Sequence, residues 1–130
     1  MADSVFTKII KGELPSSKIY EDDKTIVIVP LHPIAKGHLL VIPKVQVEQF
    51  FDLTDEDYQA LMSTVKMVAK HMKDVLQTKR VGLQVVGLDV PHAHVHILAF
   101  DNFEEYRESA DETVPPDFAK IKALADKLAL

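Results

Sequence analysis

Three histidines at alternating positions are the part of this sequence with the greatest capacity for chemistry. His92, His94 and His96 are each separated from the next by one aliphatic residue within the segment Pro91–Leu98. Because side chains alternate between the two faces of a β-strand, this spacing predicts a strand with imidazoles on one face and aliphatic groups on the other. An imidazole titrates near neutral pH and can act as a nucleophile, an acid, a base or a metal ligand. The segment is therefore the candidate functional site.

Two other interpretations of the three histidines remain open from the residues alone. One is a solvated strand face that is rich in histidine, although half of the chain's six histidines fall within this short segment. The other is a metal site, since alternate strand residues can supply two or three nitrogen ligands. The chain has no cysteine, which excludes a disulfide framework and a thiolate metal site.

An antiparallel sheet is the structure predicted to carry the histidine strand. Other runs of β-branched or apolar residues, bounded by turn residues, predict strands, and two of the connections are short enough for antiparallel pairs. We therefore expect an α+β domain with an antiparallel five-stranded sheet, one long central helix and a C-terminal helix. The other predicted strands are residues 18–21, 25–29, 38–43 and 81–86.

The predicted helices have recognisable start signals. Ser4 is the expected cap of a short helix that ends before Gly12, and Thr54 is the expected cap of a helix with an apolar stripe up to Gln77. The acidic, aperiodic stretch 101–111 predicts a solvated loop. A last helix follows two prolines, and its predicted apolar face consists of Phe118, Ile121, Leu124, Ala125 and Leu128.

The composition bounds the partners and the compartment. A net charge of −5 argues against non-specific binding to nucleic acid or to an acidic membrane surface. No apolar run approaches the length of a membrane span, and no signal peptide precedes Phe6. We therefore expect a cytoplasmic protein with no membrane association and no nucleic-acid partner.

Several segments together resemble the histidine triad nucleotide hydrolases. Residues 92–98 (His-Ala-His-Val-His-Ile-Leu) match the family's alternation of histidine with apolar residues. The segments 6–15, 20–23 and 37–44 look like the family's opening segments and occur in the same order. The resemblance implies a single domain over residues 1–130, with its core over about residues 5–100 and a C-terminal tail and helix over 101–130.

The resemblance implies a nucleotide-binding hydrolase or transferase that acts on the α-phosphate of a small-molecule nucleotide. By position, His94 would be the nucleophile and would form a nucleotidyl-histidine intermediate that water then cleaves. A neutral imidazole near its own pKa is a competent nucleophile at pH 7. His38 and His96 would surround the phosphate oxygens, where ring N–H groups stabilise developing charge. His92 would fix the orientation and tautomer of its neighbours.

The resemblance also has implications for the cofactor, the oligomeric state and the base pocket. It implies no cofactor and no metal for the reaction. It implies a homodimer, formed partly by the helix over 54–77 and the strand over 81–86. The candidate walls of a nucleotide-binding base pocket are Phe6, Ile9 and Ile28.

The chain departs from the family pattern near the substrate. Many bacterial members carry a Cys-x-x-Cys pair that helps to hold a structural zinc, but here the two positions are Ser4 and Thr7. Pro30 replaces an acidic residue that commonly binds ribose hydroxyls. The loop before the triad is short and contains Leu88-Asp89 in place of a Gln-Ser or Gln-Thr pair. Asp89 is a candidate proton donor or a simple acidic turn residue, and the altered loop leaves open a non-catalytic nucleotide- or phosphate-binding module.

The loss of an acidic residue at Pro30 predicts weak discrimination of the sugar. A charge-assisted hydrogen bond contributes about 1.5–3 kcal/mol, so its absence removes about ten- to a hundredfold in selectivity. We expect a ribonucleoside phosphoramidate and its 2′,3′-dideoxy counterpart to differ in kcat/KM by less than about fivefold. His32 is the other group able to reach the sugar, so the comparison is repeated with His32→Ala. A ribose preference of about fiftyfold in both proteins would contradict this reading.

Overall fold

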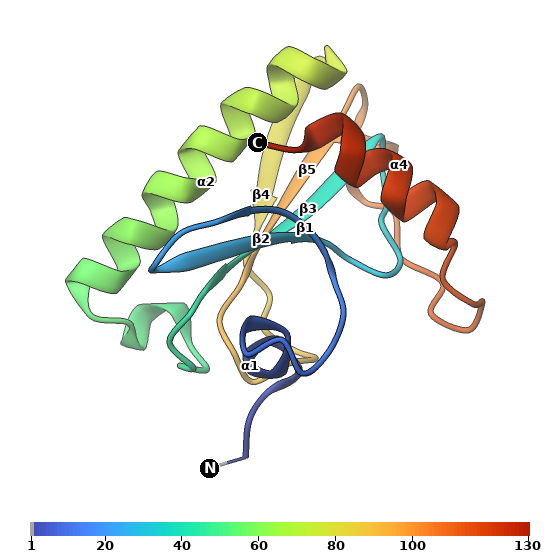
Figure 1. The fold of residues 1–130 in the computed structure, drawn as a ribbon. Helices are drawn as coiled ribbons and strands as arrows, with labels where there is room; N and C mark the ends of the chain where they lie inside the picture. The colour runs from blue at the N-terminus through green and yellow to red at the C-terminus, as the bar shows by residue number, and fades with distance from the viewer. Residues whose placement is uncertain (1) are drawn as a thin grey trace.

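The computed structural model describes residues 2–130 and is built around one five-stranded antiparallel sheet (Figure 1). The strand order is β1-β2-β3-β5-β4, so β3, which is nearly all apolar in sequence, is central. The predicted α+β class is confirmed. The strands are β1 (Ser17–Glu21), β2 (Thr25–Val29), β3 (Gly37–Pro43), β4 (Arg80–Gln84) and β5 (Val95–Phe100). The helices are α1 (Val5–Ile10), η1 (Phe50–Asp52), α2 (Asp55–Leu76), α3 (Phe103–Tyr106) and α4 (Phe118–Leu128).

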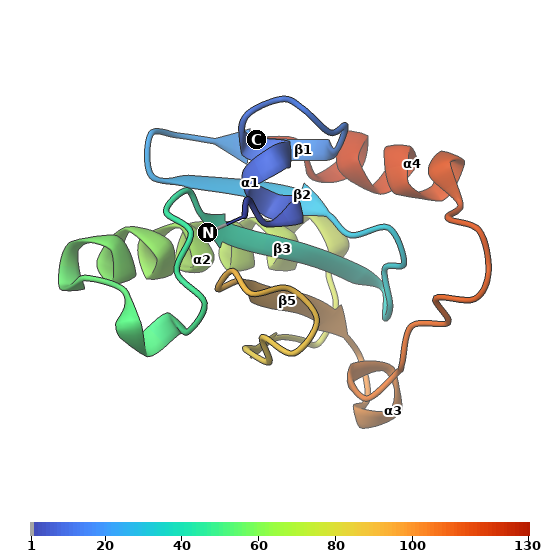
Figure 2. The ribbon, with the colours of Figure 1, turned by 90° about the horizontal axis from the view of Figure 1, so that it is seen from below.

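The sheet separates two apolar layers. α2 and α4 cover one face, and α1 lies against the other, as Figures 1 and 2 show. Alternate side chains of β3 divide accordingly: Leu39 and Val41 belong to the cluster under α2, whereas Leu40 and Ile42 belong to the cluster that includes Phe6 of α1. The period-two alternation of the strands therefore determines which residues face α1 and which face α2.

Both predicted helix caps are present. The Ser4 hydroxyl accepts a hydrogen bond from the Thr7 amide, and the Thr54 hydroxyl accepts one from the Asp57 amide. α2 ends at Leu76, and the next residue, Gln77, caps it with a left-handed backbone with φ of 57°. Of residues 2–130, no helix is both long and apolar enough to cross a membrane.

The spacing of the histidines predicts a strand through all three of them, but only the last part of the segment is a regular strand. β5 begins only at Val95, so His92 and His94 precede it. The cause lies in the hydrogen bonds of the main chain: the Ala93 amide donates to the Val47 carbonyl at 2.7 Å instead of joining the β3 ladder. Nevertheless the alternation holds, since Ala93 and Val95 are buried with the aliphatic residues.

Three other predictions of local structure were wrong in detail. β4 ends at Gln84, two residues before the predicted end of that strand. The stretch predicted as a loop contains α3, because the Asn102 side chain accepts a hydrogen bond from the Glu105 amide and caps a short helix. Phe118 begins α4 but is 67% exposed, because the buried side of that helix consists of Ile121, Ala125 and Leu128.

Candidate functional site

Four histidines gather on the face of the sheet that α1 covers. His38 comes from β3, His96 comes from the neighbouring β5, and His94 and His92 come from the segment just before β5. The ring centroids of His94 and His96 lie 5.0 Å apart, and those of His38 and His96 lie 5.2 Å apart. His38 is therefore part of the same constellation as the triad, although it is distant from it in sequence.

All four imidazoles are held in the neutral form. Burial, together with the charge that His96 would carry, lowers the pKa of His38 to about 3. Burial, with a contribution from His94, lowers the pKa of His96 to about 4. Burial also lowers the pKa of His92 and that of His94, although a main-chain hydrogen bond opposes it in each ring. At pH 7 each ring therefore carries one proton, and its partners determine which nitrogen holds it.

The His38–His96 pair has a defined proton arrangement. The Ile34 amide donates to Nδ1 of His38 at 3.2 Å, so the proton of His38 is on Nε2. That nitrogen lies 3.0 Å from Nδ1 of His96 and donates to it. Since Nδ1 of His96 accepts, His96 carries its own proton on Nε2.

His94 has the opposite tautomer. Its Nδ1 lies 2.8 Å from the main-chain carbonyl oxygen of His92, and a carbonyl oxygen can only accept. The proton of His94 is therefore on Nδ1, and Nε2 keeps its lone pair. A ring nitrogen with a free lone pair is the atom that a nucleophile or a base requires.

The reactive nitrogens of His94 and His96 are open to the site. Of residues 2–130, none provides a hydrogen-bond partner for either Nε2 atom. No buried side-chain nitrogen or oxygen in this part of the chain lacks a partner, so both Nε2 atoms must reach solvent. The site thus presents a lone pair on His94 beside an N–H donor on His96.

His92 occupies a fully buried position that anchors the segment. Its Nε2 donates to the Pro43 carbonyl oxygen at 2.7 Å, and its Nδ1 accepts from the Ser4 hydroxyl at 2.7 Å. Thr7 lies close to the same nitrogen, at 3.4 Å, and donates to the Gln46 amide oxygen at 2.6 Å. The ring thereby connects the end of β3 to the start of α1.

The predicted pocket residues lie beside the histidines. Phe6 packs edge-on against His94, with ring centroids 4.9 Å apart, and belongs to the same buried cluster as Ile28. Ile9 is partly buried against that cluster. Asp89 is exposed, and its negative charge acts on both His94 and His96, where it opposes the lowering of their pKa values.

His32 makes a hydrogen bond to the C-terminal tail. Its Nε2 donates to the Val114 carbonyl oxygen at 2.9 Å, and the tail that carries Val114 also contacts the loop over 30–36 through Glu108. Two contributors to the site were missed by the sequence reading: the Ile34 amide and Gln46. No local pattern marks either residue, because each acts through a partner that is distant in sequence or through its main chain.

The cluster around Ser4 does not fit a zinc ion. Its donors are hydroxyl and amide oxygens, whereas structural zinc sites use thiolate and imidazole ligands. Its one imidazole, that of His92, already uses both nitrogens in hydrogen bonds. Among the described residues, no group of three or more histidine, cysteine or acidic side chains is arranged to hold a metal ion.

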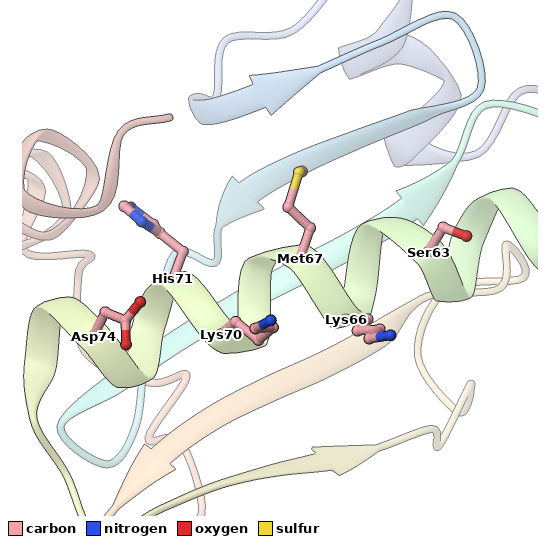
Figure 3. Close-up of a pocket in the computed structure, with 6 residues that line it drawn as sticks. All are labelled: Ser63, Lys66, Met67, Lys70, His71 and Asp74. Carbon is pink, nitrogen blue, oxygen red and sulfur yellow. The ribbon is translucent and has the colours of Figure 1, made fainter.

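A shallow depression of about 500 Å³ on the outer side of α2 is separate from the histidine site (Figure 3). Its side chains follow one another along the helix, and His71 is directed towards α4, where its Nε2 donates to the Leu128 carbonyl oxygen at 3.0 Å. The lining residues are Ser63, Lys66, Met67, Lys70, His71 and Asp74.

Comparison with known families agrees with the geometry. The HIT domain model matches residues 11–103, which include His38 and the whole triad. The chain belongs to the HIT family. This HIT protein is 32% identical to Protein hit of Bacillus subtilis, over 96% of its own chain and 94% of that protein.

Two further relatives cover nearly the whole HIT protein. It is 33% identical to adenosine 5'-monophosphoramidase of Schizosaccharomyces pombe, over 96% of its own chain and 95% of that enzyme. Its fold matches a crystal structure of a Hit-like protein from Bartonella henselae with a TM-score of 0.83 and 26% identity. That match covers 97% of this chain and 93% of the other.

The lowered pKa values predict a loss of stability in acid. An unfolded histidine binds a proton below a pH of about 6.5, whereas folded His38 and His96 stay neutral down to about 3 and 4, respectively. The unfolded state therefore gains protons first as the pH falls, and the free energy of unfolding should decrease from about pH 6.5 to about pH 4. Urea titrations across this range measure it.

The variant His38→Gln removes one of these titrating groups. It should show a shallower decrease in the free energy of unfolding over the same acid range. Between about pH 7.5 and 8.5, where the histidines are neutral in both states, the variant and the parent protein should have parallel curves. An acid slope as steep in His38→Gln as in the parent would contradict the assignment.

Proposed function

We propose that this HIT protein is a nucleotidyl hydrolase that cleaves at the α-phosphate of a nucleotide, with a nucleoside phosphoramidate as the preferred substrate class. The observation that carries the proposal is the open lone pair on Nε2 of His94 beside the N–H of His96. The relative in Schizosaccharomyces pombe, named as an adenosine 5'-monophosphoramidase, supports the same substrate class. Phe6 and Ile28 offer an apolar surface for the base next to the histidines.

The first step is attack by Nε2 of His94 on the α-phosphorus. A bond forms between that nitrogen and phosphorus, and the bond from phosphorus to the leaving nitrogen breaks. The imidazole of His94 becomes cationic when Nε2 bonds to phosphorus. Its Nδ1–H stays bonded to the His92 carbonyl oxygen, which stabilises the positive charge. His96 keeps its proton and donates a hydrogen bond from Nε2 to a phosphate oxygen, while the departing amine takes its proton from a water molecule, with Asp89 as a candidate donor at the edge of the site.

The second step is hydrolysis of the nucleotidyl-histidine. A water molecule attacks the α-phosphorus and releases a proton to the solvent, which balances the proton that the amine took up in the first step. The bond between phosphorus and His94 breaks, and the ring returns to its neutral tautomer. His38, which donates to Nδ1 of His96, keeps that ring in the orientation in which its Nε2–H can donate to the phosphate oxygens in both steps.

A non-catalytic nucleotide-binding module remains the alternative function. The observation in its favour is the short loop before the triad, where Leu88 is 85% exposed. The two functions differ in turnover: a binding module would hold a nucleotide monophosphate and would not release an amine from a phosphoramidate.

We also propose that the protein is a homodimer joined through β4 and the outer side of α2. Within residues 2–130, β4 pairs only with β5, so no other strand occupies its outer edge, and the Tyr106 hydroxyl donates to the Leu83 carbonyl oxygen at 2.8 Å. Several apolar side chains at this edge and in the following loop are exposed, namely Leu83, Val85, Val86 and Leu88. An exposed apolar edge of this kind is typical of an interface.

Light scattering at micromolar concentration should give twice the chain mass of 14.6 kDa. Leu83→Lys places a charge on the edge strand and should shift the protein towards the monomer. Leu14→Lys is the matched control, because Leu14 is 39% exposed and Leu83 is 40% exposed. A mass of one chain for the parent protein, or equal dimerisation in both variants, would contradict this surface.

Replacement of the proposed nucleophile tests the catalytic function. His94→Ala should lower kcat for phosphoramidate hydrolysis by about a thousandfold or more, because no other open lone pair is placed beside His96. Binding of a nucleoside monophosphate, measured by calorimetry, should be retained. His71→Ala, which removes an imidazole from α2, is the control and should keep the parent rate. A His94→Ala protein that keeps a tenth of that rate would exclude His94 as the nucleophile.

A further inference from the structure

We propose that Ser4 is a positioning residue for the reaction, supported by Thr7 and Gln46. Its hydroxyl holds the ring of His92 in a single tautomer, and the main chain of His92 in turn orients His94. This inference rests on the proposed function of His94 as the nucleophile. In this account, the hydrogen bonds of Ser4, Thr7 and Gln46 hold His92 in place without a metal ion.

The direction of each hydrogen bond follows from the partners. Nε2 of His92 must carry the proton because it faces the Pro43 carbonyl oxygen, so Nδ1 is an acceptor. The Ser4 hydroxyl, 2.7 Å from Nδ1, is therefore the donor. The oxygen of Ser4 meanwhile accepts from the Thr7 amide at 3.0 Å. Its single proton has two acceptors within reach, Nδ1 of His92 at 2.7 Å and the Thr7 hydroxyl oxygen at 3.2 Å, and the nearer of the two is His92.

Gln46 fixes the residues that surround His92. Its amide oxygen accepts from the Ser4 amide at 2.8 Å and from the Thr7 hydroxyl at 2.6 Å. Its amide nitrogen donates to the Ala2 carbonyl oxygen at 2.9 Å, which sets the orientation of the amide group. The start of α1 is thereby attached to the segment that follows β3.

The position of His92 is transmitted to His94 through the main chain. The carbonyl oxygen of His92 is the group that holds the proton on Nδ1 of His94. The ring of His92 is fully buried and bonded at both nitrogens, so it has one orientation, and the carbonyl of the same residue is held with it. A change at Ser4 should therefore reach the lone pair of His94 without direct contact between the two residues.

The side chains around Ser4 are poorly suited to bind a zinc ion. Hydroxyl and amide oxygens are poor zinc ligands, and a zinc ion could bind His92 only after one of its two hydrogen bonds was broken. The hydrogen bonds of Ser4, Thr7 and Gln46 connect α1 to the catalytic segment by themselves. We therefore expect the protein to be fully active without bound zinc.

Two substitutions at Ser4 separate positioning from helix capping. Ser4→Asp keeps an oxygen that caps α1, but its carboxylate cannot donate to Nδ1 of His92. Ser4→Thr keeps both the cap and the donor. We expect Ser4→Asp to lower kcat by about tenfold or more with KM nearly unchanged, and Ser4→Thr to stay within about threefold of the parent.

Nitrogen-15 NMR of the imidazoles gives a readout that does not depend on turnover. The parent and Ser4→Thr should show His92 protonated on Nε2 alone, whereas Ser4→Asp should show a proton on Nδ1 of that ring. If the parent has this tautomer but no phosphoramidase activity, the proposed function fails while the arrangement of the cluster stands.

Three results would overturn the inference. The first is a parent spectrum with His92 protonated on Nδ1. The second is a Ser4→Asp protein with the parent kcat. The third is stoichiometric zinc in parent protein purified and incubated with zinc chloride, with activity that is lost after chelation.

Discussion

The hydrogen bond from Nδ1 of His94 to the main-chain carbonyl oxygen of His92 is the interaction on which the site depends. It puts the single proton of a neutral imidazole on the inner nitrogen and leaves the lone pair on the outer one. The requirement is strict, because the other tautomer would present an N–H group to the substrate and could not attack phosphorus. Burial lowers the pKa of His94 and keeps the ring in the neutral form that this arrangement needs.

The site needs residues from several elements of the fold, and not only from the segment that carries the three histidines. His38 reaches the site from β3, and it sets the proton of His96 through the pair of ring nitrogens 3.0 Å apart. The His92 ring connects the end of β3 with the start of α1. The opposite face of the same strands packs under α2, where Val95 and Ile97 are buried. The histidines of this segment therefore form the site on one face of the sheet, while the aliphatic residues between them pack in the core on the other face.

Much of this arrangement follows from local pattern, and the rest depends on long-range contacts. The strand β2 and the caps at Ser4 and Thr54 were predicted, because each is determined by neighbouring residues. The start of β5 was not predicted, because the Ala93 amide bonds to Val47, far away in sequence. The exposure of Phe118 depends on how α4 is rotated against the sheet, and the contribution of Gln46 depends on contact with α1. The roles that the resemblance implied for His38, His92, His94 and His96 remain predictions, although the structure brings all four together.

Direct detection of the covalent intermediate tests the central claim most directly. The protein is mixed with an aminoacyl adenylate analogue or a nucleoside phosphoramidate, quenched within one turnover and digested at alkaline pH, and the modified peptide is fragmented by mass spectrometry. Our account predicts a nucleotidyl group on His94 and none on His92, His96 or His38, and no adduct in His94→Ala. A nucleotidyl group on another histidine, or turnover with no adduct on His94 at any quench time, would contradict it.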